Sequence, residues 1–213
     1  MNTISHYHNR VHGKHTLIRW LGRLALAGVS FYFLVAAVLQ FLRTDYSFLG
    51  TPLSFYLLGP YNGWLHAAFY VLAAAIVSLA LATYLSSAAQ WRSITTLVLF
   101  MLGAIGVVVT AVAATDTNAR LTVHGAIHLA AAALAFSATS FGMLLQSWQF
   151  RRDPVWRHHF RPAMELAVFE FLVLWFYALI HTRVNGFMEK LTIVLILIWL
   201  GQQAGRLARL RRH

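Results

Sequence analysis

The chain contains no cysteine and few acidic residues. Its 213 residues include six aspartates and glutamates against 17 lysines and arginines. Without cysteine there are no disulfides, thiolate metal sites or lipidated thiols. Only 11% of the residues are charged and 59% are hydrophobic, which is too apolar for a soluble domain of this length. The composition therefore predicts an integral membrane protein.

Six apolar runs approach or reach the roughly twenty residues that a helix needs to cross a bilayer core of ~30 Å. They lie at Leu21–Leu42, Trp64–Leu85, Ile94–Ala114, Val123–Leu145, Ala163–Ile180 and Phe187–Leu200. No segment shows the alternation of apolar and polar residues that is typical of the strands of a membrane barrel. We therefore expect an all-α fold, a polytopic membrane bundle of six transmembrane helices over residues 21–207. A polar tail (1–20) precedes it and a short basic tail (208–213) follows it.

The opening of the chain resembles a secretory signal, because a basic segment precedes an apolar one. The apolar run continues past the small pair Ala36 and Ala37 through Leu42, which is too long for an ordinary signal. We expect an uncleaved anchor.

Lysine and arginine are unevenly distributed between the two sides of this bundle. The tails and the second and fourth joints carry most of them, whereas the other joints hold only Arg43, Arg120, Arg183 and Lys190. Because positive joints stay on the cytoplasmic side, both termini are predicted to be cytoplasmic. The net charge of +11 then reflects topology, so the expected partners are membrane lipids and no nucleic acid. A larger membrane complex is left open.

Polar residues near the joints opposite the termini outline a candidate pocket. His124 and His128 lie four residues apart and so share a helix face. Glu170 falls in the middle of a span, where an unpaired carboxylate is costly, and we expect it to pair with His128. The other pocket candidates are Asp45, His66, Tyr70, Asp116, Arg120, Tyr177, His181 and Glu189.

Two histidines at this spacing with a carboxylate are typical of a site for zinc or another divalent metal. His124, His128 and Asp116 are therefore candidate metal ligands. In the alternative interpretation, one histidine bonds a neighbouring helix and the other lies in the wet interface. The early histidines His6, His8, His12 and His15 are interpreted as solvated.

Three functional classes follow, and whether the chain is an enzyme is left open. The first is a metal-dependent membrane hydrolase or transferase that acts on lipid. The second is a non-catalytic accessory or lipid-binding subunit. The third is a b-type haem or quinone protein in which His66 or His181 faces His128. In each class the site is a polar pocket at the outer side that binds a metal, a lipid head group or another small ligand.

Several short motifs resemble those of one family. They are Asp45-Tyr46-Ser47, Leu53-Ser54, Gly59 to Gly63, Asp116 followed by His124 and His128, and Gly186 to Glu189 before a last helix with Trp199. Together they resemble the bacterial multi-pass family catalogued as domain of unknown function nine-nine-eight. The resemblance spans most of the chain and implies a prokaryotic membrane protein with several spans. We expect it in the bacterial cytoplasmic (inner) membrane. It implies no established activity or cofactor.

Overall fold

The computed structural model describes residues 3–117, 121–180 and 184–210, with side chains from residue 13 onward. Arg120 and His181, two of the predicted pocket residues, lie outside the described residues. Within them the chain forms α1 (Thr3–Leu42), α2 (Asn62–Ser86), α3 (Ile94–Val112), α4 (Val123–Phe150), α5 (Phe160–Leu179) and α6 (Asn185–Ala208). Short 3₁₀ turns lie at η1 (Leu53–Leu57), η2 (Ala89–Trp91) and η3 (Arg157–His159).

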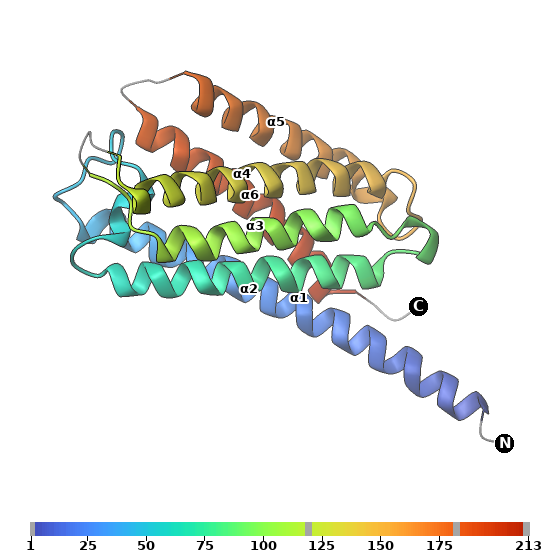
Figure 1. Ribbon diagram of the computed structural model, residues 1–213. Helices are drawn as coiled ribbons and strands as arrows, with labels where there is room; N and C mark the ends of the chain where they lie inside the picture. The colour runs from blue at the N-terminus through green and yellow to red at the C-terminus, as the bar shows by residue number, and fades with distance from the viewer. Residues whose placement is uncertain (1–2, 118–120, 181–183, 211–213) are drawn as a thin grey trace.

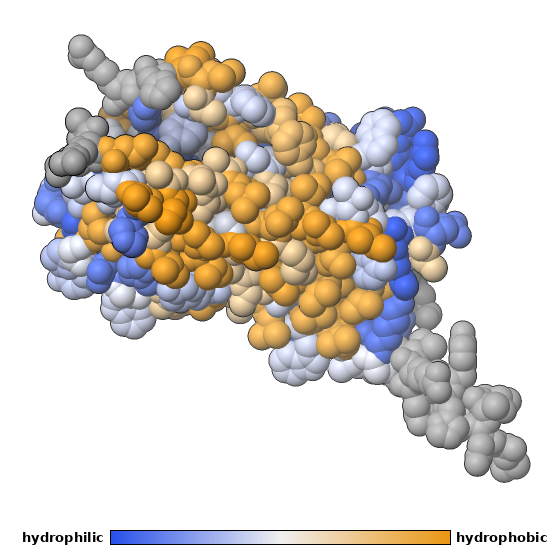
Figure 2. Space-filling view, viewed as in Figure 1, coloured by the Kyte–Doolittle hydropathy of each residue, from blue (hydrophilic) through white to orange (hydrophobic). Residues whose placement is uncertain are grey.

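All six long helices contain a stretch that is long and apolar enough to span a membrane. The described part of the chain contains no strand. Figure 2 shows hydrophobic side chains in a broad band across the middle of the visible face, with hydrophilic residues toward both ends. The predicted all-α membrane bundle of six spans is therefore confirmed.

The helices alternate in direction, so the joints fall at two opposite ends of the bundle (Figure 1). We call one the odd-joint end, formed in the described part of the chain by residues 43–61, 113–117, 121–122, 180 and 184. The other is the even-joint end, formed by residues 87–93 and 151–159. Helix α1 begins and α6 ends at the even-joint end, so both termini lie on the same side of the bundle.

Helix α1 is longer than the sequence predicts, because it begins at Thr3 instead of near Leu21. Forty helical residues span about 60 Å, twice the thickness of the bilayer core. Its N-terminal part accordingly projects beyond the other helices in Figure 1. The polar tail is thus a continuation of the first helix.

The even-joint half of the bundle is closely packed. Trp199 of α6 is buried, and its indole Nε1 donates to Ser147 Oγ at 3.2 Å and to the carbonyl of Ala163 at 3.1 Å. Phe100 of α3 stacks on Trp199 with 5.9 Å between ring centroids. One tryptophan therefore joins α3, α4, α5 and α6 at this level.

Helices α4 and α5 contact each other mainly in that same half. Their ring contacts are Trp148 with Phe160 and Phe141 with Phe171, and Ser140 bonds Glu170. Toward the odd-joint end α5 diverges from α4 in Figure 1. This divergence leaves room for a cavity in the odd-joint half.

Candidate functional site

A cavity of about 560 Å³ occupies the odd-joint half of the bundle, within the roughly 300–1,000 Å³ typical of small-molecule sites. Along α4 its lining runs from His128 to Thr139, a length of about 16 Å. Most lining side chains are apolar and come from all six helices, among them Phe69, Leu72, Ile76, Val107, Ile193 and Ile196. The arrangement suits an elongated hydrophobic molecule.

The cavity reaches the surface of the bundle between α4 and α5. Leu129 and Ala133 of α4 and Trp175 and Ala178 of α5 line it and are exposed on the bundle surface. These residues lie where the two helices diverge. The cavity lining therefore includes exposed residues of two neighbouring helices.

Polar groups line the cavity near the joints, and the first is Asp116 in the joint before α4. Its carboxylate accepts a hydrogen bond from the backbone N–H of Thr122 and another from the Thr122 hydroxyl, both at 2.7 Å. These two bonds lower the pKa of Asp116. Thr122 is also the N-cap of α4, since its hydroxyl accepts from the Gly125 N–H. The carboxylate lies against Gly125, at the position that a Cβ would occupy.

His128 is the second polar group and lies one turn deeper in α4. The residue is 2% exposed, and its Nδ1 lies 2.8 Å from the carbonyl oxygen of Ala113. This bond ties α4 to the residue that follows α3. His128 therefore lines the cavity with its ring orientation fixed.

Glu189 is the third, and it connects three elements. Its carboxylate accepts from the backbone N–H of Leu53 at 3.0 Å and from the hydroxyl of Tyr177 at 3.3 Å. Both Tyr177 and Glu189 line the cavity. The carboxylate thus holds the first joint, α5 and α6 together at the cavity wall.

The first joint forms part of the cavity wall and is itself well ordered by side-chain bonds. Pro52, Ser54 and Phe55 line the cavity. Lys190 of α6 donates to the carbonyl of Phe48 at 2.8 Å, and the backbone of Thr51 lies so close to Gly186 that any side chain there would collide with it. The joint therefore packs on the start of α6.

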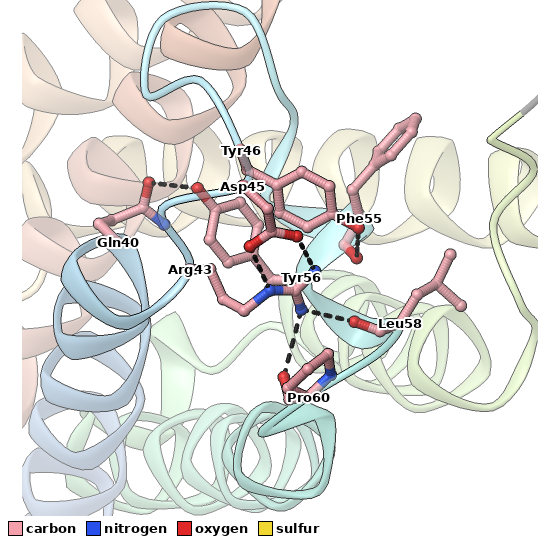
Figure 3. Close-up of polar contacts among 8 residues, drawn as sticks. All are labelled: Gln40, Arg43, Asp45, Tyr46, Phe55, Tyr56, Leu58 and Pro60. Carbon is pink, nitrogen blue, oxygen red and sulfur yellow. Dashed lines mark hydrogen bonds and ion pairs between the residues drawn. The ribbon is translucent and has the colours of Figure 1, made fainter.

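Arg43, which is 4% exposed, organises this joint from within (Figure 3). Its guanidinium makes two bonds to Asp45, at 2.9 and 2.8 Å, and donates to the carbonyls of Leu58 and Pro60 at 2.6 and 3.2 Å. It also lies over the ring of Tyr46, 4.3 Å from the centroid. These hydrogen bonds lower the pKa of Asp45. Asp45 is thus a partner of Arg43 and does not line the cavity.

Of the predicted pocket residues, Asp116, His128, Tyr177 and Glu189 do line one cavity. His66 does not, and its Nε2 lies 3.2 Å from the carbonyl oxygen of Leu57. Tyr70 is 45% exposed on the bundle surface. His124 is exposed in the first turn of α4, so the two histidines do not share a buried face. Only one face of α4 packs on α3 and α5, so residues of its first turn that lie on the other faces are exposed.

The predicted pairing of Glu170 with His128 is wrong. Glu170 is fully buried and accepts from the hydroxyl of Ser140 at 2.8 Å. Ser140 lies twelve residues beyond His128, about 18 Å along α4. The antiparallel register of α4 and α5 therefore separates the two groups, and Glu170 does not line the cavity.

The metal interpretation finds no support in this geometry. Across the described ranges no three His, Asp or Glu side chains are grouped so that they could hold a metal ion. Both oxygens of Asp116 are bonded to Thr122.

Sequence patterns did not indicate several residues that shape the site. Thr122 is recognisable as an N-cap before an apolar run, but not as the partner of Asp116. Ser140 is an inconspicuous small residue among others. In the sequence, Arg43 counts only toward the distribution of positive charge between the two sides, although its position two residues before Asp45 is compatible with a local ion pair.

Comparison with known proteins agrees with the resemblance in sequence. The model of the family described as protein of unknown function (DUF998) matches residues 25–204, a range that includes at least part of each of the six spans and all described residues of the cavity lining. The searches of curated proteins and of solved structures gave no significant match. The chain belongs to the DUF998 family of membrane proteins of unknown function.

Proposed function

We propose that this protein binds one lipid-like amphiphile from the bilayer, with the hydrophobic part in the cavity and the polar part at the odd-joint end. The observation that carries the proposal is the cavity itself, which is elongated, lined mostly by apolar side chains, and has Asp116, His128 and Glu189 toward one end. A soluble polar substrate would leave the apolar lining without a partner.

The lateral opening between α4 and α5 supports the same conclusion. Its residues, Leu129, Ala133, Trp175 and Ala178, are exposed and belong to helices that are long and apolar enough to span a membrane. The hydrophobic part of a ligand that enters here passes from the hydrocarbon core of the bilayer into the apolar cavity without crossing water. We propose further that the odd-joint end faces away from the cytoplasm, because most lysine and arginine lies at the other end.

The test fills the cavity and measures binding. Ala132 lines the cavity, whereas the neighbouring Ala130 is exposed and does not. In native mass spectrometry of the purified protein, hexadecan-1-ol should bind to the natural chain and to Ala130→Trp, and binding should be lost in Ala132→Trp. Thermal unfolding in detergent checks that both variants fold. Equal binding by both folded variants would show that the ligand lies elsewhere.

A further inference from the structure

The polar end of the cavity is rich in hydrogen-bond acceptors. Asp116 and Glu189 contribute carboxyl groups, and an ionised carboxylate can accept hydrogen bonds but cannot donate them. Two nearby hydroxyl groups already point their hydrogens at them, since Thr122 donates to Asp116 and Tyr177 to Glu189. The hydroxyl groups of Tyr32, Ser54 and Thr115 also line the cavity, and each of them can donate or accept a hydrogen bond.

The bond between His128 and Ala113 determines what the imidazole offers to a ligand. A carbonyl oxygen can only accept, so Nδ1 must carry the hydrogen in the 2.8 Å contact with Ala113. In a neutral ring the lone pair then lies on Nε2. Within the described residues Nε2 has no protein partner, although the residue is 2% exposed and lines the cavity. His128 therefore presents an unused acceptor to the cavity.

Cations are missing from the described lining. None of the lining residues is a lysine or an arginine. The nearby ammonium of Lys190 is bound to the Phe48 carbonyl, and the guanidinium of Arg43 to Asp45. Among the described lining residues, an anionic head group would thus meet the Asp116 carboxylate and the His128 lone pair with no cation to offset them.

We infer that the amphiphile carries a hydrogen-bond-donating head, a hydroxyl or an amine, which donates to His128 Nε2 beside Asp116 and Glu189. This inference rests on the proposed function and names the chemical class of its ligand. Phosphate and carboxylate heads are disfavoured beside His128, because the Asp116 carboxylate repels a negative charge and Nε2 offers it no hydrogen.

The first test compares three probes with the same chain: hexadecan-1-ol, hexadecylamine and hexadecyl phosphate. The natural protein should bind the alcohol or the amine at least tenfold more tightly than the phosphate. Tighter binding of the amine than of the alcohol would indicate a ligand with a cationic head group. Tighter binding of the alcohol would indicate a neutral head group. Phosphate binding as tight as that of both donors would overturn the inference and leave the proposed cavity in place. No binding of any probe would remove the proposed function together with the inference.

The second test changes only the acceptor of His128. Asparagine places an amide N–H near the Nδ1 position and lacks an atom at Nε2, whereas glutamine places an acceptor near Nε2. His128→Asn should weaken binding of hexadecan-1-ol about three- to tenfold, the range for one hydrogen bond, and His128→Gln should restore much of it. His124→Asn on the exposed surface is the matched control. If a folded His128→Asn binds the alcohol as the natural chain does, Nε2 is not the acceptor and the inference fails.

Discussion

At the scale of single residues, Glu170 stands out because its buried carboxyl group is only partly hydrogen-bonded. It is fully buried, and one oxygen accepts from Ser140 while the other, Oε2, has no partner among the described residues. No described lysine, arginine or histidine forms an ion pair with it. A carboxyl group in such surroundings costs folding free energy, most of all when it is ionised.

Replacing Glu170 by glutamine should therefore leave stability unchanged or raise it. The amide keeps an acceptor for Ser140 and carries no charge that burial would penalise. By contrast, Ser140→Ala should lower the free energy of unfolding by about 1 kcal/mol, because it removes the one hydrogen bond of a buried acceptor. Thermal unfolding in detergent measures both, with Glu165→Gln on the exposed surface of α5 as control. A large loss of stability in Glu170→Gln would instead indicate a bound cation or proton that the carboxyl group holds.

At the scale of the helices, close contact between α3 and α4 depends on glycine. A Cβ on Gly106 would lie 2.6 Å from the backbone nitrogen of Ala135 and 2.8 Å from the carbonyl oxygen of Ala131. The obstacle is backbone, which cannot rotate away as a side chain does. Small residues at this interface thus let two membrane helices approach, as is common in bundles.

Gly106→Ala should accordingly destabilise the protein by about 1–3 kcal/mol, because α3 and α4 must separate to admit the methyl group. The matched control is Gly205→Ala in α6, where a Cβ meets nothing within 4 Å. That change should be neutral or stabilise by up to about 1 kcal/mol, through the better helix propensity of alanine. Thermal unfolding of the two variants side by side provides the comparison. Equal stabilities would contradict the close α3–α4 contact.

At the scale of the whole molecule, tertiary contacts sharpen the difference in charge between the two ends. At the odd-joint end, Arg43 and Lys190 are buried and bonded within the protein. At the even-joint end, Arg151, Arg152 and Arg157 are exposed. The accessible positive charge of the described residues is therefore concentrated beside the termini.

This distribution predicts that both termini face the cytoplasm. The chain has no cysteine, so single cysteines can be introduced without further changes. Exposed sites are Tyr61 and Leu121 at the odd-joint end and Arg152 at the even-joint end. In intact cells a membrane-impermeant thiol reagent should label Tyr61→Cys and Leu121→Cys, but Arg152→Cys only after the cells are opened. The reverse pattern would invert the orientation.

The sequence by itself determined the number of spans, the all-α class and the placement of both termini at one end. These properties depend on local composition, since an apolar run of membrane length must satisfy its backbone hydrogen bonds as a helix wherever its neighbours lie. It also pointed to Asp116, His128, Tyr177 and Glu189, because ionisable and polar groups beside apolar runs are conspicuous.

Only the tertiary structure decided which of these groups meet. Glu170 bonds Ser140 instead of His128, and His124 faces outward, because the rotation and register of each helix depend on side chains from several elements at once. The buried position of Arg43 could not be predicted from the sequence, because it depends on hydrogen bonds to the carbonyls of Leu58 and Pro60, fifteen or more residues away. The cavity likewise arises where α5 diverges from α4, and hydropathy along one chain carries no information about the distance between two helices.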